Sequence, residues 1–166
     1  MESLALYRIS DRYIRFLSGI DRRVPYNKGN HRPYIGVVLS VGEYRYFVPM
    51  ESPKPNHINI KPDTHIMKLD GGRYGLLGFN NMLPVPDSAL TLLDIDAEQD
   101  AQYADLLHRQ ITFINRHKAE VLNHAAKTYY KACNAQPNSF FRNVCCDFKK
   151  LEHSCKRYNP NYKKPQ

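Results

Sequence analysis

The chain has 166 residues and a mass of 19.3 kDa, which is enough for one domain with its own core. Hydrophobic residues make up 42% and charged residues 24%, a balance that excludes a disordered chain. No apolar run approaches the roughly 18 residues of a membrane span, and the N-terminal segment lacks the pattern of a secretory signal. We therefore expect a single domain over residues 1–166, located in the cytoplasm and without a membrane partner.

The net charge of +8 is concentrated at the two ends of the chain. Residues 1–40 carry seven basic and three acidic side chains, and residues 126–166 carry nine basic and two acidic ones, whereas 41–125 is net negative. If the ends meet in the fold, they form one basic surface that suits a polyanion, and 12 tyrosines offer rings for base stacking. A nucleic acid is the favoured partner. The alternative is a basic surface that is merely solvated.

The N-terminal segment predicts a strand, a short helix and a long loop. Residues 4–9 alternate in the manner of a strand. Ser10 or Asp11 then offers an N-cap for a helix that Gly19 ends. Residues 21–33 are polar and basic, and a loop of this length is often functional.

Two hairpins follow. Residues 34–40 and 44–49 are apolar runs joined at 41–43, and the continuous first run is typical of a central, buried strand. Residues 51–64 contain three prolines and predict a second long loop. Residues 65–69 and 74–79 predict another hairpin around Asp70-Gly71-Gly72, and 82–93 an irregular or edge strand.

From Asp96 onward the apolar period becomes helical. Asp96 and Gln99 resemble a capping box, and the apolar face continues to Cys133 with a break near residues 115–117. A final helix is expected from about Ser139, and the basic tail at about 157–166 is expected to be loose. Strands followed by helices indicate an α+β fold, an antiparallel sheet with helices packed on it.

The sequence predicts neither a metal nor a cofactor. Its four cysteines, at positions 133, 145, 146 and 155, form no Cys-x-x-Cys pair, so we expect buried, reduced thiols. The phosphate-binding loop, the dinucleotide fingerprint, the nucleophile elbow and the zinc-protease helix are also missing from the sequence.

The two long loops bracket the first hairpin and predict a phosphate-binding cluster. In an antiparallel hairpin the first strand starts beside the end of the second, which brings Arg32 near Lys54, with Ser52, His31 and His57 in the same loops. A guanidinium and a hydroxyl can grip phosphate oxygens, and a lysine crowded by cations loses its proton more readily. Such a lysine could transfer a proton or stabilise a pentacoordinate phosphorus. The plainer alternative is two exposed loops that happen to be basic.

The same region carries a recognisable pattern. It reads Arg32-Pro33-Tyr34-Ile35-Gly36-Val37-Val38-Leu39, then Tyr46-Phe47-Val48-Pro49-Met50-Glu51-Ser52-Pro53-Lys54 with His57. Residues 6–14, 90–94 and 110–114 match as well. Over most of residues 4–130 the sequence resembles the ToxN/AbiQ/CptN family, the endoribonuclease toxins of type III toxin–antitoxin systems.

This resemblance implies a strongly twisted antiparallel sheet with flanking helices, similar to Kid/MazF-type toxins. It also implies metal-independent, sequence-specific cleavage of single-stranded RNA to 2′,3′-cyclic phosphate and 5′-OH ends. The expected partners are a small pseudoknot RNA antitoxin, which the toxin processes and which inhibits it, and cellular mRNA, but not DNA. Toxin and antitoxin are expected to form a closed heteromer with several copies of each, serving abortive infection against phage.

Carried over by position, Ser52 and Lys54 match the family's catalytic serine and lysine, and Arg32 a phosphate-contacting position. His57 completes the catalytic set; Lys54, His57 or water could remove the 2′-OH proton. Glu51 departs from relatives that have threonine there, and we expect it to point away from the phosphate or to pair with a cation. The expected RNA-binding residues are Tyr26, Lys28, His31, Arg22, Arg23, Lys149, Lys150, Lys156 and Arg157.

Two other functions remain open from the sequence. A non-catalytic RNA-binding module would use the same cluster only to hold phosphates. A DNA-binding regulator is disfavoured because no helix-turn-helix pattern is present and loops carry the charge.

Overall fold

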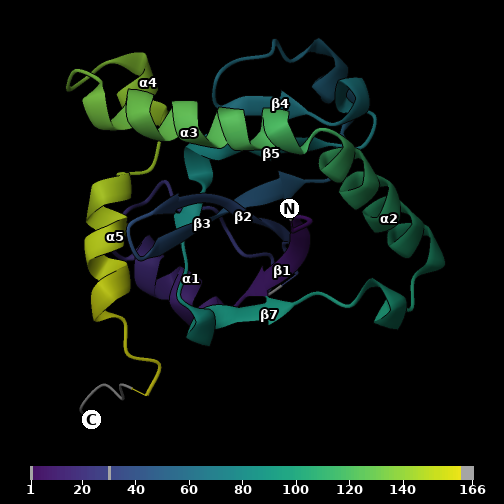
Figure 1. The fold of residues 1–166 in the computed structure, drawn as a ribbon, viewed down its shortest axis with the longest axis horizontal. Helices are drawn as coiled ribbons and strands as arrows, with labels where there is room; N and C mark the ends of the chain where they lie inside the picture. Colours follow the sequence, from purple (N-terminus) through teal and green to yellow (C-terminus); the bar gives the residue numbers. More distant parts are fainter. Residues whose placement is uncertain (1, 30, 162–166) are drawn as a thin grey trace.

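A computed structural model describes residues 2–29 and 31–161 of the chain (Figure 1). The strands are β1 (Ala5–Ile9), β2 (Tyr34–Val41), β3 (Tyr44–Glu51), β4 (Ile66–Lys68), β5 (Leu76–Gly78), β6 (Leu83–Pro84) and β7 (Leu90–Leu92). The α-helices are α1 (Asp11–Ser18), α2 (Ala101–Arg116), α3 (Lys118–Asn134), α4 (Phe140–Val144) and α5 (Phe148–Arg157). Short 3-10 helices are η1 (Pro55–Asn59), η2 (Asp70–Gly72), η3 (Phe79–Asn81), η4 (Asp87–Ala89) and η5 (Ile95–Ala97).

The β2–β3 hairpin forms the centre of the sheet. Within the described residues the seven strands are ordered β4-β5-β3-β2-β1-β7, β6 pairs with β3, and every pairing is antiparallel. In Figure 1, α2, α3 and α5 frame this sheet on three sides. The predicted α+β fold class is therefore confirmed, as are both predicted hairpins and the central position of the first long strand.

The N-terminal elements match the expected pattern. Of the two candidate caps for α1, Ser10 is the one used: its hydroxyl accepts a hydrogen bond from the backbone N–H of Tyr13 at 3.2 Å. Gly19 follows the last helical residue. Tyr13, Ile14 and Leu17 point into the core, which fixes α1 against the sheet.

The predicted N-cap of the long helix is wrong, and the helix begins four residues later than predicted. Asp100, not Asp96, caps α2, because its carboxylate accepts the backbone N–H groups of Gln102 and Tyr103. Asp96 lies in η5, a separate turn capped by Asp94. The expected break is confirmed: α2 ends at Arg116, and α3 begins after His117.

The expected single C-terminal helix is two helices. Between α4 and α5 the backbone N–H of Cys146 donates to the carbonyl of Asn80 at 2.9 Å, a contact that takes this residue out of the helical ladder. Asp147 then caps α5 through the N–H of Lys150. Arg157 closes α5, Tyr158 packs on Tyr13 with ring centroids 4.7 Å apart, and residues 162–166 of the expected loose tail lie outside the described residues.

None of the helices in the described part of the chain is long and apolar enough to cross a bilayer. The cytoplasmic location stays a prediction.

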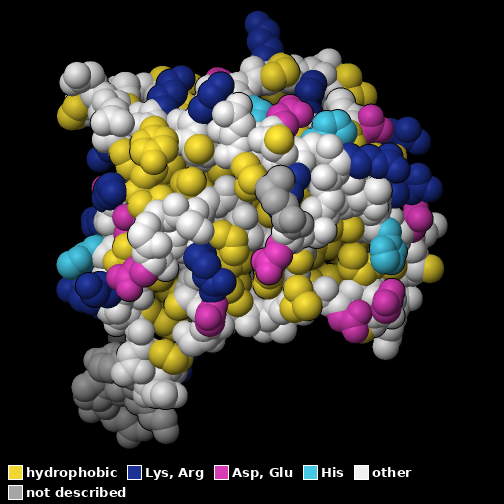
Figure 2. Space-filling model, viewed as in Figure 1, with side chains coloured by type: hydrophobic (Ala, Val, Ile, Leu, Met, Phe, Trp, Pro, Cys, Tyr) yellow, Lys and Arg dark blue, Asp and Glu magenta, His cyan; other side chains and the backbone are white. Residues whose placement is uncertain are grey.

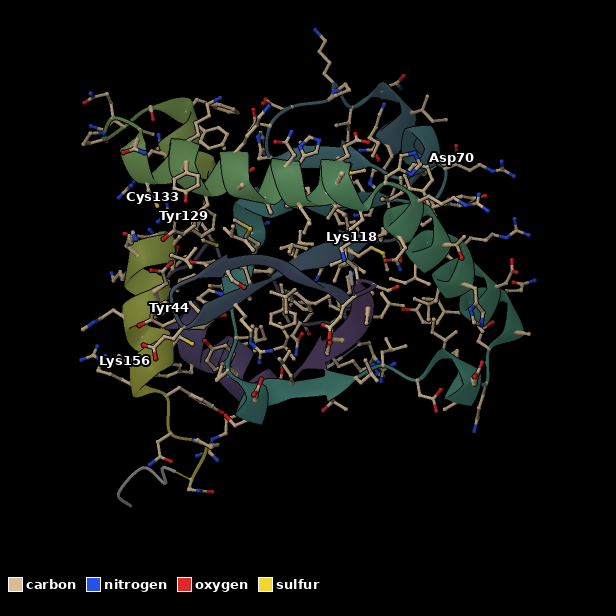
Figure 3. The ribbon with its side chains drawn as sticks, viewed as in Figure 1. Tyr44, Asp70, Lys118, Tyr129, Cys133 and Lys156 are labelled. Carbon is tan, nitrogen blue, oxygen red and sulfur yellow. The ribbon has the colours of Figure 1, made fainter. Side chains whose placement is uncertain are left out.

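A buried carboxylate joins the sheet to two helices. The hydroxyls of Tyr46 on β3 and Tyr129 on α3 donate to Glu152 Oε2 on α5, at 2.6 and 2.7 Å. Figure 3 shows Tyr129 pointing from α3 toward α5. Burial and the hydrogen bond to Glu152 raise the pKa of Tyr46, so its hydroxyl remains a donor. Phe148 packs against both tyrosine rings, with centroids 5.7 Å apart in each case.

A second buried carboxylate attaches the loop at residues 21–33 to the C-terminal helices. Asp21 accepts from Arg23 Nε at 2.9 Å and from the backbone N–H of Asp147 at 2.7 Å. The Arg23 guanidinium also donates to the carbonyl of Arg142 at 3.0 Å. Burial raises the pKa of Asp21, but the hydrogen bonds from Arg23 and Asp147 outweigh it and the net pKa is lowered.

We predict that Glu152→Ala destabilises the fold by about 2–4 kcal/mol, because two buried hydroxyls lose their acceptor. Glu152→Gln keeps one acceptor oxygen and should cost about 1 kcal/mol. Urea unfolding followed by circular dichroism measures both. The control is Glu120→Ala on the exposed side of α3, which should change the free energy of unfolding by about 0.5 kcal/mol or less. If Glu152→Ala and Glu120→Ala lowered the free energy of unfolding equally, the hydrogen-bond network around Glu152 would not stabilise the fold as predicted.

We predict a pH-dependent contribution from Asp21. Its folded pKa lies below the unfolded value of about 3.9, so its stabilisation is present above that pH and is lost as the pH falls through the folded pKa. Asp21→Asn should therefore lower stability at neutral pH and flatten the acid limb of the stability curve. Asp96→Asn, at an exposed aspartate, should change neither the stability at neutral pH nor the slope of the acid limb. An acid limb equally steep in Asp21→Asn and the wild type would refute the assignment.

Candidate functional site

The register of the central hairpin brings the two long loops together, as expected from the sequence. Tyr34 pairs with Pro49, and the backbone N–H of Met50 donates to the carbonyl of Pro33 at 3.1 Å. Arg32 precedes this pairing and Glu51 follows it. Both loops therefore leave the sheet at the same end of the β2–β3 pair.

The loop after β3 is held by a buried histidine. The backbone N–H of Lys54 donates to His57 Nδ1 at 3.3 Å, and the N–H of His57 donates back to the carbonyl of Lys54 at 3.0 Å. His57 is 1% exposed, whereas Ser52 and Lys54 are exposed. The buried histidine ring thus fixes the turn from its core side, and Ser52 and Lys54 lie on the solvent side.

Two glycines allow this loop to lie against the η2 turn. A Cβ at Gly72 would lie 3.1 Å from the backbone of His57, and one at Gly75 would collide with the carbonyl oxygen of Glu51. Gly75 also has φ +98°, a conformation that disfavours other residues. Lys68 adds a hydrogen bond from its ammonium to the carbonyl of Ile58 at 3.0 Å. Close backbone packing therefore sets the position of Lys54.

The loop before β2 is anchored by Asn27. Its amide donates to the carbonyl of Ile9 at 3.1 Å, and its own backbone carbonyl accepts from the N–H groups of His31 and Arg32. Asn27 is 2% exposed, while Tyr26, Lys28 and His31 are exposed, Tyr26 to 77%. Arg32 Nε donates to the carbonyl of Tyr26 at 2.8 Å. This bond leaves the two terminal NH₂ groups of Arg32 available.

The cluster formed by Arg32, Ser52 and Lys54 is positively charged. Within the described part of the chain, neither Arg32 nor Lys54 has an acidic partner. The nearby carboxylate of Glu51 lies 3.4 Å from His57 Nε2. Because His57 Nδ1 accepts from the backbone N–H of Lys54, the ring proton is on Nε2, the nitrogen that lies close to Glu51. Glu51 therefore lies against His57, and the expectation that it points away from the phosphate or pairs with a cation stays a prediction.

The remaining predicted RNA-binding residues lie in four places. Arg22 and Arg23 share a hollow of about 310 Å³ with Lys150, so the basic ends of the chain do meet. Lys149 lies 3.7 Å from Glu152 Oε1, and its ammonium is 5.3 Å from the Tyr129 ring centroid.

Lys156 lines a separate hollow with Tyr44 and Arg45, and Arg157 lines another beside Arg12. Figure 2 shows Lys and Arg side chains toward the rim of this face, over α5 and beside α2. The basic surface is therefore distributed over several hollows around the molecule.

The residues at 2–29 and 31–161 contain no group of three or more His, Cys, Asp or Glu side chains that could hold a metal ion. All four cysteines are free, and burial raises the pKa of Cys145 to about 12.

The sequence-based interpretation missed the residues that position the cluster from behind. Asn27, Gly72 and Gly75 carry no reactive group, and they act through buried hydrogen bonds and close backbone contacts. A signal was present at Asn27-Lys28-Gly29, a turn sequence inside a functional loop. Nothing in the sequence shows that Gly75 lies against Glu51.

Comparisons with known proteins agree with the geometry. The family model described as toxin ToxN of the type III toxin–antitoxin system matches residues 5–156. The endoribonuclease ToxN of Bacillus thuringiensis subsp. kurstaki is 34% identical over 160 residues, covering 92% of this chain and 82% of that protein.

Two solved structures are similar to this chain over nearly its whole length. One is from a study of bacterial type III toxin–antitoxin systems and selective toxin inhibition by a non-coding RNA pseudoknot. It has a TM-score of 0.83, 32% identity, and coverage of 96% of this chain and 100% of its own. The other is AbiQ, a lactococcal anti-phage endoribonuclease, with a TM-score of 0.83, 27% identity and coverage of 95% and 98%. The resemblance noted in the sequence is confirmed, and the chain belongs to the ToxN family of type III toxin–antitoxin toxins.

Proposed function

We propose that this chain is a single-domain endoribonuclease that cleaves single-stranded RNA at the cluster of Arg32, Ser52 and Lys54. The predicted enzyme class is confirmed by relatives named as endoribonucleases. The observation that carries the site is a half-buried Arg32 and an exposed Lys54, neither with an acidic partner in the described residues, on two loops that leave the same end of the β2–β3 pair, with the exposed Ser52 two residues before Lys54. All three stand on backbone held by buried contacts.

The cluster suits an attack by a ribose 2′-OH on the adjacent phosphate. The 2′-oxygen forms a bond to phosphorus, the bond to the 5′-oxygen breaks, and the products are a 2′,3′-cyclic phosphate and a 5′-OH. Arg32 orients the phosphate with its planar fork, and the Ser52 hydroxyl donates to a non-bridging oxygen. Lys54 stabilises the added charge of the pentacoordinate state or transfers a proton. The required 2′-OH explains why DNA would not be cut.

His57 has a positioning role in this proposal. Its ring is 1% exposed, and both ring nitrogens face residues of its own loop. A ring so placed does not reach the phosphate directly. His57 accepts a hydrogen bond from the backbone of Lys54 and contacts the carboxylate of Glu51. Without this contact the carboxylate would be free to turn toward the substrate and repel it. The proton acceptor for the 2′-OH is therefore Lys54 or water.

The proposed partners are a small pseudoknot RNA antitoxin, which the toxin processes, and cellular mRNA. The support is the net charge of +8 and a similar structure from work on toxin inhibition by an RNA pseudoknot. Exposed Tyr26, Lys28 and His31 extend the cluster on one side, and Arg22 and Lys150 offer a second basic area. A closed assembly of several toxins and RNAs would use both areas. The anti-phage role of AbiQ supports a role in abortive infection.

The alternative is an RNA-binding module without catalysis, in which the cluster only grips phosphates. The exposed Ser52 and the ammonium of Lys54, which has no acidic partner among residues 2–29 and 31–161, favour the enzyme. A module of that kind would bind RNA with the salt dependence of phosphate contacts and leave the RNA intact.

We predict that Lys54→Ala lowers the cleavage rate about 100-fold or more, and Ser52→Ala about 10–100-fold, because each removes charge stabilisation in the transition state. Binding of a single-stranded RNA should weaken much less. The measurement is single-turnover cleavage on denaturing gels, with end-group analysis for the cyclic phosphate.

The matched control is Lys61→Ala, which removes an exposed lysine from the same loop. It should cleave at the wild-type rate. Full cleavage by Lys54→Ala would remove the centre of the proposal, and a wild type that binds RNA without cutting it would favour the module.

We predict that His57→Gln slows cleavage through Lys54 rather than by a chemical role of its own. The single variant should be slowed about 10-fold or more, whereas His57→Gln added to Lys54→Ala should cause little further loss, since residues that act as a unit are non-additive. A double-mutant cycle on single-turnover rates measures this. Fully additive losses would assign His57 an independent role.

A further inference from the structure

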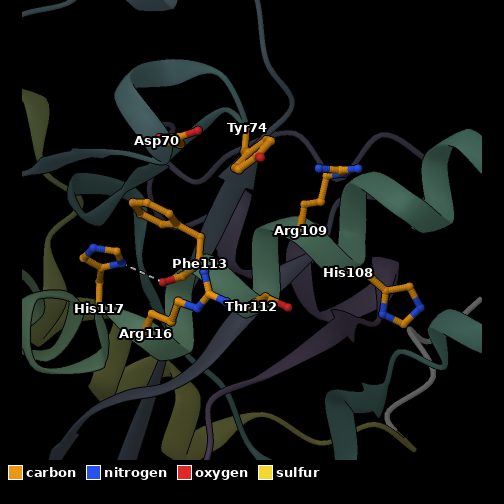
Figure 4. Close-up of a pocket in the computed structure, with 8 residues that line it drawn as sticks. All are labelled: Asp70, Tyr74, His108, Arg109, Thr112, Phe113, Arg116 and His117. Carbon is orange, nitrogen blue, oxygen red and sulfur yellow. Dashed lines mark hydrogen bonds between the residues drawn. The ribbon is translucent and has the colours of Figure 1, made fainter.

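A hollow of about 460 Å³ lies beside the cluster, on the other side of the η2 turn (Figure 4). Its volume falls within the range of about 300–1,000 Å³ typical of ligand sites. None of the residues predicted from the sequence lines it. The lining residues are Asp70, Tyr74, His108, Arg109, Thr112, Phe113, Arg116 and His117.

One wall of the hollow is aromatic. The rings of Phe113 and His117 are stacked with centroids 4.0 Å apart, and His117 Nδ1 is 2.9 Å from the carbonyl oxygen of Phe113. The carbonyl can only accept, so Nδ1 carries a proton, which fixes the tautomer of the neutral ring and leaves Nε2 as its acceptor. Tyr74 adds a third ring, and Figure 4 shows it beside the guanidinium of Arg109. Such rings offer flat faces for a nucleobase.

The charge of the hollow is unbalanced in favour of an anion. Arg109 Nε donates to Asp105 at 2.8 Å, and Arg73 lies 3.6 Å from Asp70. Arg116 is exposed and, within residues 2–29 and 31–161, has no ion-pair or hydrogen-bond partner from its side chain. The guanidinium of Arg116 can bind the phosphate of a nucleotide while the neighbouring aromatic rings stack on its base.

The wall that faces the cluster is a single turn of backbone. The segment from Asp70 to Gly75 borders the hollow on one side, and Gly72 and Gly75 pack against the backbone of His57 and Glu51 on the other. An RNA strand bound at Lys54 therefore passes over η2 to reach the hollow.

The geometry points to a nucleotide subsite in this hollow, where a base of the single-stranded RNA substrate stacks on Tyr74 and the Phe113–His117 pair while Arg116 binds its phosphate. This inference rests on the proposed function, because it assigns a flanking nucleotide of the same substrate. Arg116 and the rings touch no reacting atom, so they are specificity and binding residues.

The test compares two RNAs whose cut site has been mapped with the wild type. One extends well beyond the cut on both sides, and the other retains only the nucleotides next to it. Arg116→Gln and Phe113→Leu should each lower kcat/KM for the long RNA about 10-fold, mostly through KM, and leave the trimmed RNA unaffected. Arg116→Gln should also reduce the salt slope of long-RNA binding by about 0.7, the value for one lost phosphate contact on a single strand.

The control is Arg15→Gln, which removes an exposed arginine from α1. It should behave as the wild type on both RNAs. Wild-type kinetics for Arg116→Gln and Phe113→Leu on the long RNA, or equal losses on the long and trimmed RNAs, would overturn the subsite.

The proposed function can fail separately. If the wild type cuts no RNA, no cut site can be mapped, and the same variants are instead compared by fluorescence anisotropy with one long single-stranded RNA. Weaker binding by Arg116→Gln than by Arg15→Gln would then support the subsite, and equal binding would overturn it.

Discussion

Antiparallel pairing of β2 with β3 is the constraint on which the site depends. Because Tyr34 faces Pro49, the segment that enters β2 and the segment that leaves β3 emerge side by side. Both central strands are buried on both faces, so a shift of register by one residue would move side chains such as Tyr34, Tyr46 and Phe47 into packing positions shaped for their neighbours. The hydrophobic core thereby fixes the distance between two loops that have few apolar contacts of their own.

The structure separates the groups that hold the site from the groups that act in it. Asn27, His57 and Asp21 are buried and satisfy backbone donors or acceptors of the loops. Exposed side chains such as Lys54 carry the charge. This arrangement resolves a conflict, because a cluster of unpaired cations repels itself and gains nothing for folding until an anion binds. The loops need other contacts to keep their shape, and the buried amide, imidazole and carboxylate provide them.

Most of the fold could be predicted from periodicity and turn signals. The hairpins at 34–49 and 65–79 and the break at His117 are encoded in local patterns of apolar residues. One error arose where two local capping patterns lay close together, and the other where a non-local contact overrode a local pattern. Asp96 has the sequence context of a cap, yet Asp100 is the residue that accepts the helical N–H groups. The apolar face from Phe141 to Leu151 suits one helix, yet the bond from Cys146 to Asn80 divides it.

The candidate site, too, has a part that could be predicted from nearby residues in the sequence and a part that could not. That the loops carrying Arg32, Ser52 and Lys54 leave the sheet at the same end follows from strand order alone, and it was predicted; their joint action stays a prediction. The hollow next to it is built from the η2 turn and from α2, and α2 is distant in sequence from both loops. No local pattern links Arg116 or Phe113 with Lys54, so only the folded chain shows that they adjoin.

The bond between Asp21 and the backbone of Asp147 has a consequence for the synthesis of this protein. The loop that carries Tyr26, Lys28 and Arg32 is synthesised well before its anchor, because that anchor requires Arg142 and Asp147. A growing chain, or one truncated before these residues, therefore has all the side chains of the proposed catalytic cluster without one of the contacts that fixes it. If Arg32, Ser52 and Lys54 act as proposed, the loop that carries Arg32 gains this anchor only after residue 147 has been synthesised.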